Sequence, residues 1–293
     1  MSSPVGDSVY FACYGSLTIH NAMLQDRERM MFYERAILGN TKLFQNKTVL
    51  DVGCGLGVLS LFAAKAGAKK VYAVEASPDI LQLACETFAI NGFDHVIEAV
   101  EGVIEDMTIM DDIDIVVSEW MGYCLLYEMM LPSVLKARDK YQPKLLIPDE
   151  GSILIAGFKN SFYHQKRFGW TQDETLGMNL SSLSQDISSN IWNETCLSEN
   201  ITTSCCQVFK ADLYTLDQGQ CRNIKETKFE LKLKVLEPKP MLHGILIYFE
   251  THLNQGPAGK LTLTTSPHGD PTHWQQSLCL FETPVWFEGR LGN

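Results

Sequence analysis

The stretch SEWMGYCLLYEMM, residues 118–130, places two carboxylates around a glycine-containing apolar turn. Glu119 follows the apolar run 115–117, and Glu128 follows the run 125–127. An ionised carboxylate is costly to bury unless a cation is paired with it. No Lys or Arg occurs within this stretch. Either both acids reach solvent, or the missing cation belongs to a substrate.

A second segment, VLDVGCGLGVLS (49–60), predicts a nucleoside-binding turn. Gly53, Gly55 and Gly57 fall where a predicted strand passes into a helix, and glycine lets the backbone approach a ligand closely. Glu75 lies 18 residues after Gly57, at the end of the next predicted strand. An acid in that place commonly binds ribose hydroxyls. A tight turn with a solvated Glu75 is the alternative, and the βαβ context favours the ligand site.

The spacing of the glycines indicates which nucleoside is bound. A dinucleotide fingerprint would require a third glycine where this chain has Val58. G-x-G-x-G with Asp51 upstream favours S-adenosyl-L-methionine, because its sulfonium and amino groups suit acidic surroundings. We therefore expect a methyltransferase that uses S-adenosyl-L-methionine rather than a dehydrogenase.

Alternating elements must position these residues. Strands are predicted near 47–53, 70–77, 96–102 and 112–120, with helices at 20–38, 58–67 and 77–92. This alternation predicts a parallel, doubly wound sheet. Further on, the segment 162–186 reads as irregular helix, and alternating apolar residues predict strands at 228–237, 243–253 and 259–266. We expect a helical cover (1–40), a Rossmann-like α/β domain (41–149) and a β-rich domain (150–293).

The composition narrows the class of protein. The 293 residues are 45% hydrophobic and 20% charged, which is typical of a folded protein. The net charge of −11 argues against direct nucleic-acid binding and suits basic substrates. The nine cysteines show no C-x-x-C spacing, and we find neither a secretory leader nor a membrane-length apolar run. We expect a reduced protein of the cytoplasm and/or nucleus, with no membrane partner.

A methyl donor and two acids fit one acceptor, the guanidinium group of arginine. Guanidinium stays protonated, is planar and offers five N–H donors, so carboxylates can hold it in a fork. Glu119 and Glu128 would hold two edges and leave the electrons of one nitrogen facing the methyl group. Catalysis would then rest on positioning and electrostatics.

At these residues the chain resembles the type I branch of the protein arginine N-methyltransferase family, over nearly its whole length. SEWMGYCLLYE resembles the family's double-glutamate loop. YFACY (10–14) and HNAMLQDRER (20–29) resemble its N-terminal cofactor cover, and THW (272–274) its threonine-histidine-tryptophan loop. The resemblance implies a β-barrel, a helical dimerisation arm at about 162–186 and a homodimer. It also implies mono- and asymmetric dimethylation of arginine in Gly-Arg-rich proteins or histones.

The resemblance further implies roles for single residues, with no metal among them. Cofactor binding would fall to His20, Arg29, Asp51, Gly53, Gly55, Gly57, Glu75, Glu105 and Tyr14. Catalysis would fall to Glu119, Glu128, His273 and Asp26, with His273 paired to Asp26, and the substrate pocket to Met23, Met130 and Trp274. Within the cofactor group, Arg29 would bind the methionine carboxylate, Glu75 the ribose and Glu105 the adenine.

The chain departs from the family pattern in two places. Leu56 stands where family members commonly have threonine, which removes a hydroxyl near the cofactor. The resemblance also implies further barrel strands beyond Asn293. Two alternatives stay open, a catalytically weak scaffold and a small-molecule methyltransferase. Intact Glu119 and Glu128 argue against the first, and the β-rich half with its arm argues against the second.

Overall fold

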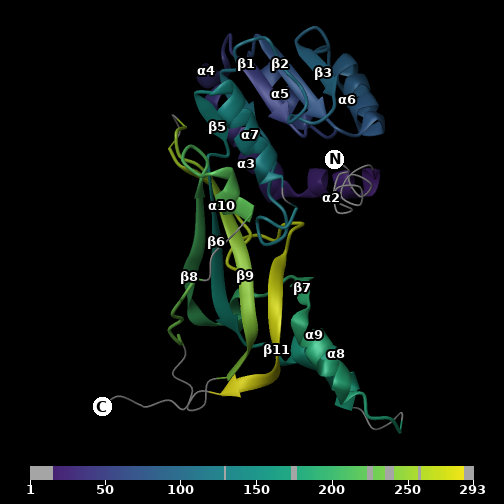
Figure 1. The fold of residues 1–293 in the computed structure, drawn as a ribbon, viewed down its shortest axis with the longest axis vertical. Coiled ribbons are helices and arrows are strands. Elements are labelled where there is room, and N and C mark those ends of the chain that lie inside the picture. The colour runs from purple at the N-terminus through teal and green to yellow at the C-terminus, as the bar shows by residue number, and fades with distance from the viewer. Residues whose placement is uncertain are drawn as a thin grey trace.

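The computed structural model describes residues 16–128, 130–172, 177–222, 227–234, 241–256 and 259–286. An α/β unit lies at one end of the long axis and an antiparallel sheet extends away from it (Figure 1). The expected combination of a Rossmann-like domain and a β-rich domain is confirmed. The longest described helix has 13 residues, and none of the described helices would cross a bilayer.

The first sheet is parallel throughout, with the strand order β3-β2-β1-β4-β5. Its strands are β1 (Thr48–Val52), β2 (Lys70–Glu75), β3 (Ile97–Glu101), β4 (Ile115–Val117) and β5 (Leu145–Ile147). The helices α5 (Val58–Lys65), α6 (Pro78–Ile90) and α7 (Leu131–Tyr141) connect them. The central strands are almost continuously apolar because both faces of the sheet are covered.

The order of the strands reverses between β1 and β4, since the chain winds outward to β2 and β3 and then returns to the other side of β1. Ligands of open α/β sheets bind at the carboxyl ends of the strands at such a switch point. The glycine turn leaves β1 there, Glu75 ends β2, and Glu119 follows β4. Topology therefore gathers at one edge the segments that the sequence separates.

The N-terminal cover is two helices, α2 (Leu17–Gln25) and α3 (Arg27–Ile37), and the single helix expected over 20–38 is wrong. Asp26 between them has extended backbone angles, φ −70° and ψ 100°. Its carboxylate accepts a hydrogen bond from the backbone N–H of Arg29 and caps α3. An N-cap aspartate favours a helix start over a helix interior. A short helical segment, η1 (Leu38–Asn40) and α4 (Thr41–Phe44), leads into β1.

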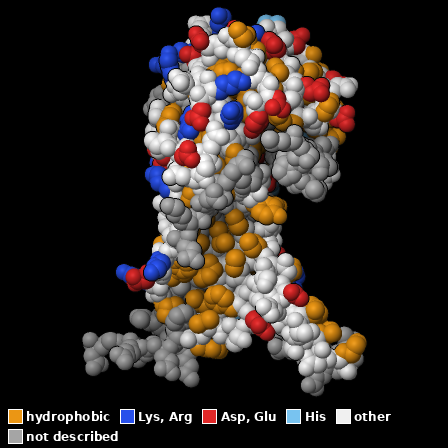
Figure 2. Space-filling view, viewed as in Figure 1, with side chains coloured by type: hydrophobic (Ala, Val, Ile, Leu, Met, Phe, Trp, Pro, Cys, Tyr) orange, Lys and Arg blue, Asp and Glu red, His pale blue; other side chains and the backbone are white. Residues whose placement is uncertain are grey.

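The second sheet is antiparallel, with the order β7-β11-β9-β6-β8 and β10 paired with β9. Its strands are β6 (Glu150–Phe158), β7 (Ile191–Glu194), β8 (Ile201–Asp212), β9 (Met241–Leu253), β10 (Leu261–Thr264) and β11 (Gln276–Trp286). Within the described ranges the edge strands β7 and β8 are not paired with each other, so the sheet is not closed there. Apolar side chains lie over this sheet, whereas charged ones gather over the α/β unit (Figure 2).

The half-buried strand expected over 228–237 is not found in its described part, 228–234. That part makes only an isolated bridge between Leu233 and Thr203 of β8, with neighbouring hydrogen bonds to residues 202 and 204. Phe229 and Leu233 are 50% and 37% exposed. Alternating apolar residues predict a face to bury, but no described element covers this one. The predictions at 243–253 and 259–266 correspond to β9 and β10.

The helical segment expected at 162–186 is present. It comprises α8 (Ser161–Phe168), η2 (Gly169–Gln172), η4 (Ser181–Leu183) and α9 (Ser184–Ser189), and we call residues 161–189 the arm. Phe168 and Ile187 pack with Leu246 and Leu278 of the antiparallel sheet. The arm lies at the end of that sheet far from the α/β unit (Figure 1). It exposes large apolar side chains, namely Phe162, Trp170, Met178 and Leu183.

The two sheets share one apolar core across their junction. The Trp120 ring lies against Gly151, where an added Cβ would approach it to 2.7 Å. Arg138 of α7 donates from Nη1 to the backbone oxygens of Leu213 and Leu216, at 2.6 and 2.8 Å, ahead of α10 (Gln218–Arg222). A short turn, η5 (Ser198–Asn200), precedes β8. At this junction Trp274 donates to the backbone oxygen of Met121, in the segment that follows β4.

Candidate active site

The glycine turn after β1 is shaped for close approach of a ligand. Gly53, Gly55 and Gly57 have φ of +71°, +54° and +80°, a region that residues with a Cβ rarely adopt. A Cβ on Gly53 would lie 2.2 Å from Cε of Met130. One on Gly55 would lie 3.0 Å from Cε1 of His20. Met130 and His20, both expected at the site, therefore cover this turn.

Glu75 is held at the end of β2 by backbone donors. Its Oε2 accepts from the N–H of Gly55 and its Oε1 from the N–H of Ser77, both at 2.9 Å. Each carboxylate oxygen has capacity for more than one hydrogen bond. Both can thus also accept from a vicinal diol, as the ribose prediction requires.

Asp51, inside β1, is 1% exposed, and its Oδ2 accepts from Oγ of Ser60 at 2.7 Å. Burial raises the pKa of Asp51 to about 7, against the lowering effect of the Ser60 hydrogen bond. Its buried Oδ1 has no hydrogen-bond partner among the described residues. A buried carboxylate in this condition is stabilised by a cationic donor, which fits a ligand with an ammonium group.

The loop that carries Glu119 and Glu128 is closed on itself. Gly122 and Leu125 exchange two backbone hydrogen bonds of 2.9 Å. Glu128 packs against Gly122, where a Cβ would lie 2.6 Å from its Cγ. We call residues 118–128 the clamp loop. The two acids, nine positions apart in sequence, are joined by a compact turn.

A cation of the chain itself reaches Glu119, which corrects the inference that only a substrate could supply one. Nε of Arg29 lies 3.2 Å from Oε2 of Glu119, and each side chain is 10% exposed. Oε1 of Glu119 accepts from the backbone N–H of Met121 at 3.1 Å. The interpretation that both acids simply reach solvent is likewise wrong for Glu119. The partner comes from α3, 90 positions earlier in the chain.

Arg29 also binds the end of α2. Its Nη1 donates to the backbone oxygen of Met23 at 3.2 Å and lies 3.4 Å from the sulfur of Met30. No described residue accepts a hydrogen bond from Nη2. The side chain therefore joins the helical cover to the clamp loop, while the expected contact with a cofactor carboxylate remains a prediction.

His273 and Asp26 are brought together, as the family resemblance implied. Oδ2 of Asp26 lies 2.7 Å from Nδ1 of His273 and accepts from its backbone N–H at 2.9 Å. Burial alone would raise the pKa of Asp26, but the hydrogen bonds from His273 and Arg29 outweigh it and lower the pKa. The Asp26 carboxylate is thus ionised at neutral pH and fixes the imidazole.

Trp274, expected in the substrate pocket, is 3% exposed and lies behind the clamp loop. Its Nε1 donates to the backbone oxygen of Met121 at 3.0 Å. Its ring packs edge-on against Phe249 and beside His273, with centroid distances of 5.3 and 4.0 Å. The side chain thus supports the loop that carries both acids.

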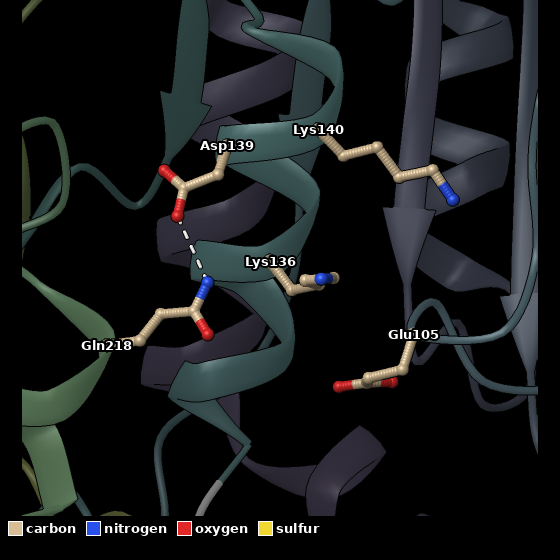
Figure 3. Close-up of a pocket in the computed structure, with 5 residues that line it drawn as sticks. All are labelled: Glu105, Lys136, Asp139, Lys140 and Gln218. Atoms are coloured by element: carbon tan, nitrogen blue, oxygen red, sulfur yellow. Dashed lines mark hydrogen bonds between the residues drawn. The ribbon is translucent and has the colours of Figure 1, made fainter.

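The remaining predicted residues are more dispersed. Met23 is 9% exposed on α2, and Leu56 is half-buried in the glycine turn. Glu105 lies at an open cleft of about 450 Å³ beside Lys136 and Lys140 (Figure 3). Its Oε1 accepts from Oγ of Ser133 at 2.7 Å. Tyr14 lies outside the described residues.

The sequence reading missed Tyr33. It is fully buried on α3, and its hydroxyl donates to the backbone oxygen of Ser118 at 3.0 Å. Ser118 in turn donates from Oγ to the oxygen of Val52 at 2.7 Å. These bonds fix the start of the clamp loop to the end of β1. A tyrosine on the buried face of a predicted helix was the available signal, because its hydroxyl needs a partner there.

Two family comparisons match different parts of the chain. Residues 149–289 match the arginine methyltransferase oligomerization subdomain. Residues 36–137 match ribosomal protein L11 methyltransferase (PrmA), which indicates a methyltransferase-type α/β domain. In the described residues no group of three or more His, Cys, Asp or Glu could hold a metal ion.

Relatives that match nearly the whole of this chain show its family. Protein arginine N-methyltransferase 1 of Saccharomyces cerevisiae is 37% identical over 294 residues, covering 96% of this chain and 82% of the relative. The chain belongs to the protein arginine N-methyltransferase family. Probable protein arginine N-methyltransferase 6.1 of Oryza sativa is 35% identical over 309 residues, covering 95% and 80% of the two chains. The expected S-adenosyl-L-methionine-dependent protein arginine methyltransferase is thereby confirmed.

Solved structures agree. A chain of the Trypanosoma brucei PRMT1 enzyme-prozyme heterotetrameric complex with AdoHcy superposes with a TM-score of 0.87 at 33% identity, over 94% of this chain and 85% of that one. Arabidopsis thaliana protein arginine methyltransferase 10 superposes with a TM-score of 0.79 at 28% identity, over 94% and 86%. The expected fold class is confirmed, with the second sheet open in the described residues.

Proposed function

We propose that this chain transfers methyl groups from S-adenosyl-L-methionine to protein arginines and forms mono- and asymmetric dimethylarginine. The observation that carries this proposal is the clamp loop. It holds Glu119 and Glu128 on one closed turn at the switch point of the sheet, next to the glycine turn and the His273–Asp26 pair.

The residues present fit the cofactor. Glu75 would accept from the ribose hydroxyls, and Arg29 would bind the carboxylate of the cofactor. Oδ1 of Asp51, which has no partner among the described residues, would accept from its ammonium group. Glu105 would accept from the adenine, in an orientation set by Ser133. When bound, the cofactor would supply an electrophilic methyl group.

On the acceptor side, Glu119 and Glu128 would accept N–H bonds from two edges of the guanidinium. Carboxylates on those edges draw positive charge toward the nitrogens that they bind, so the remaining nitrogen keeps electron density for the transfer. Trp274 and Tyr33 hold the backbone of the loop in place. Ionised Asp26 holds His273 with its Nδ1–H toward the carboxylate, which steadies the wall of the site.

Met23 and Met130 support the assignment of an asymmetric product. Met130 covers Gly53 of the glycine turn, and the backbone oxygen of Met23 accepts from Arg29, which binds Glu119 of the clamp loop. Their side chains would limit the room around the accepting nitrogen. Incubation with a Gly-Arg-rich peptide and labelled cofactor should give a doubly methylated peptide that loses dimethylamine in the mass spectrometer. Loss of monomethylamine would identify a symmetric product and overturn this part of the proposal.

Substitution of each acid tests its role, and binding of the cofactor product by the same variant is the control. Glu119→Gln and Glu128→Gln should nearly abolish methylation while S-adenosyl-L-homocysteine still raises the melting temperature of both variants, because ligand that binds only the folded state stabilises it. Methylation near the wild-type rate by either variant would remove the clamp from the mechanism. A wild-type protein that binds the product but methylates no peptide would instead identify a scaffold.

We further propose a homodimer formed through the arm. The match to an oligomerization subdomain and the exposed apolar side chains of the arm support assembly. Light scattering coupled to size exclusion should give about twice the chain mass of 32.9 kDa. A monomer with full activity would contradict this assignment.

Cellular placement completes the proposal. No disulfide joins any two of the eight described cysteines, which suits a reducing compartment. We therefore place the protein in the cytoplasm and/or nucleus, where Gly-Arg-rich proteins or histones would be its substrates. Fractionation with marker proteins tests the compartment, and recovery of the chain from a secretory fraction would refute it.

A further inference from the structure

Arg29 contacts one of the two ligand sites that the proposed function requires, and it is assigned to the other. Its Nε edge binds Glu119, one of the two acids assigned to the acceptor arginine. Its Nη1 is fixed on the backbone oxygen of Met23. Nη2 has no acceptor among the described residues. The guanidinium of Arg29 thus already occupies Oε2 of Glu119, the acid that should also bind the guanidinium of the acceptor arginine.

The charges around Glu119 make this contact consequential. Both partners are 10% exposed, so water screens their attraction weakly. An acceptor arginine that binds Glu119 must bring a second positive charge next to Arg29. Two like charges in one weakly screened site disfavour each other. Arg29 therefore lowers the affinity of Glu119 for the acceptor unless its own charge is balanced elsewhere.

A carboxylate at Nη2 would supply that balance. It would draw the positive charge of Arg29 toward the donor side and weaken its bond to Glu119. Oε2 of Glu119 would then be available to the acceptor guanidinium, while Oε1 stays bound to the backbone N–H of Met121. The carboxylate in question is that of the amino-acid part of the methyl donor, so this argument rests on the proposed function.

We propose that Arg29 is a positioning residue that couples the two sites, so that a donor-site carboxylate increases the affinity of the clamp for arginine. The coupling is positive and reciprocal, because linkage requires each ligand to strengthen the other by the same factor. Binding of the donor therefore prepares the clamp for the acceptor.

The test compares two donor-site ligands in equilibrium titrations of a peptide that contains one arginine. S-adenosyl-L-homocysteine carries the carboxylate, and 5′-methylthioadenosine lacks the amino-acid part. Saturation by each is first established by its own titration. The first ligand should lower the peptide Kd about tenfold, within the usual range of such coupling, whereas the second should leave it within about twofold. Equal effects of the two ligands would overturn the proposal.

Arg29→Gln separates coupling from structural damage. The variant should bind the peptide more tightly than the wild type when neither nucleoside is added, because Glu119 has lost its internal cation, and S-adenosyl-L-homocysteine at saturation should no longer change the peptide Kd. Weaker peptide binding by Arg29→Gln in every condition would mean that Arg29 only supports the fold, and the coupling would be refuted.

A lysine-for-arginine peptide is the specificity control and should bind in no condition. If the arginine peptide binds and shows no carboxylate dependence, the coupling fails and the proposed function stands. If neither peptide binds while S-adenosyl-L-homocysteine does, the clamp and the coupling fail together.

Discussion

Replacing Trp274 by phenylalanine tests whether the loop 272–274 acts by supporting the clamp loop. The indole Nε1 donates to the backbone oxygen of Met121 at 3.0 Å, and both residues are almost fully buried, at 3% and 2% exposure. Phenylalanine keeps an aromatic ring against Phe249 and His273 but removes the donor. The variant therefore isolates one hydrogen bond to the loop that carries Glu119 and Glu128.

The expected magnitude follows from the burial. Leaving a buried carbonyl without its donor costs about 1 to 3 kcal/mol, and the smaller ring leaves a gap that adds on the order of 1 kcal/mol. We expect a loss of about 3 kcal/mol in the free energy of unfolding, or roughly 5 to 10 °C in melting temperature for a chain of this size. A displacement of the acids by about 1 Å can cost on the order of a hundredfold in rate. We expect about half of that effect in log units, so kcat should fall at least tenfold.

The assay combines thermal unfolding, methyl transfer to an arginine peptide and titration with S-adenosyl-L-homocysteine. Trp192→Phe is the matched control, because its Nε1 donates to the oxygen of Ile187 at 3.3 Å from a half-buried position beside the arm. It should lose about 1 kcal/mol or less of stability and keep kcat. Trp274→Phe should keep its affinity for the product. A Trp274→Phe variant with an unchanged kcat would refute the support that we assign to this side chain.

Three further predictions follow from single contacts. Gly55→Ala should weaken binding of S-adenosyl-L-homocysteine at least tenfold, because φ of Gly55 is +54° and alanine rarely adopts that region. A loss of about 1.4 kcal/mol in binding free energy already corresponds to a factor of ten. Gly39→Ala is the control and should leave binding unchanged, because Gly39 has open space around it. Ser133→Ala should raise the Kd of the same ligand several-fold by freeing Glu105, and Ser133→Thr should restore it; equal Kd values for Ala and wild type would exclude that role. Burial, together with nearby positive charge, lowers the pKa of His243 to about 4, so the unfolded chain binds the extra proton between pH 4 and 6.5. Stability should rise with pH across that window, by at most about 1.4 kcal/mol per pH unit from this group, and His243→Asn should flatten urea-derived stability against pH relative to wild type.

Much of the donor site could be predicted from the sequence because its determinants are local. Three glycines at a strand-to-helix turn and Glu75 at the next strand end lie within one βαβ unit, and their spacing fixes their places on it. The two acids of the clamp loop are likewise near neighbours in the chain. Periodicity indicated the parallel sheet, the arm and the strands β9 and β10, because buried faces repeat with the period of the element.

The pairing of side chains across the fold was decided only by tertiary structure. Arg29 meets Glu119 across 90 positions, Trp274 meets Met121 across 153, and His273 meets Asp26 across 247. The Asp26–His273 pair was expected from family resemblance, and nothing in the spacing alone indicates it. The cation for Glu119 could not be predicted from the loop, because Arg29 lies 90 positions earlier and no local spacing connects the two residues.

Predictions from local periodicity were wrong where a neighbouring element, and not the pattern itself, decides the structure. The alternation at 228–234 describes a face to bury, but whether another element covers that face is a property of the whole fold. Asp26 interrupts a stretch that otherwise has helical periodicity, because its carboxylate caps the next helix and binds His273 at the same time. The sequence by itself determined most of the elements and the chemistry that they carry. The tertiary structure decided which charges meet, since that depends on how the two sheets and the helical cover dock.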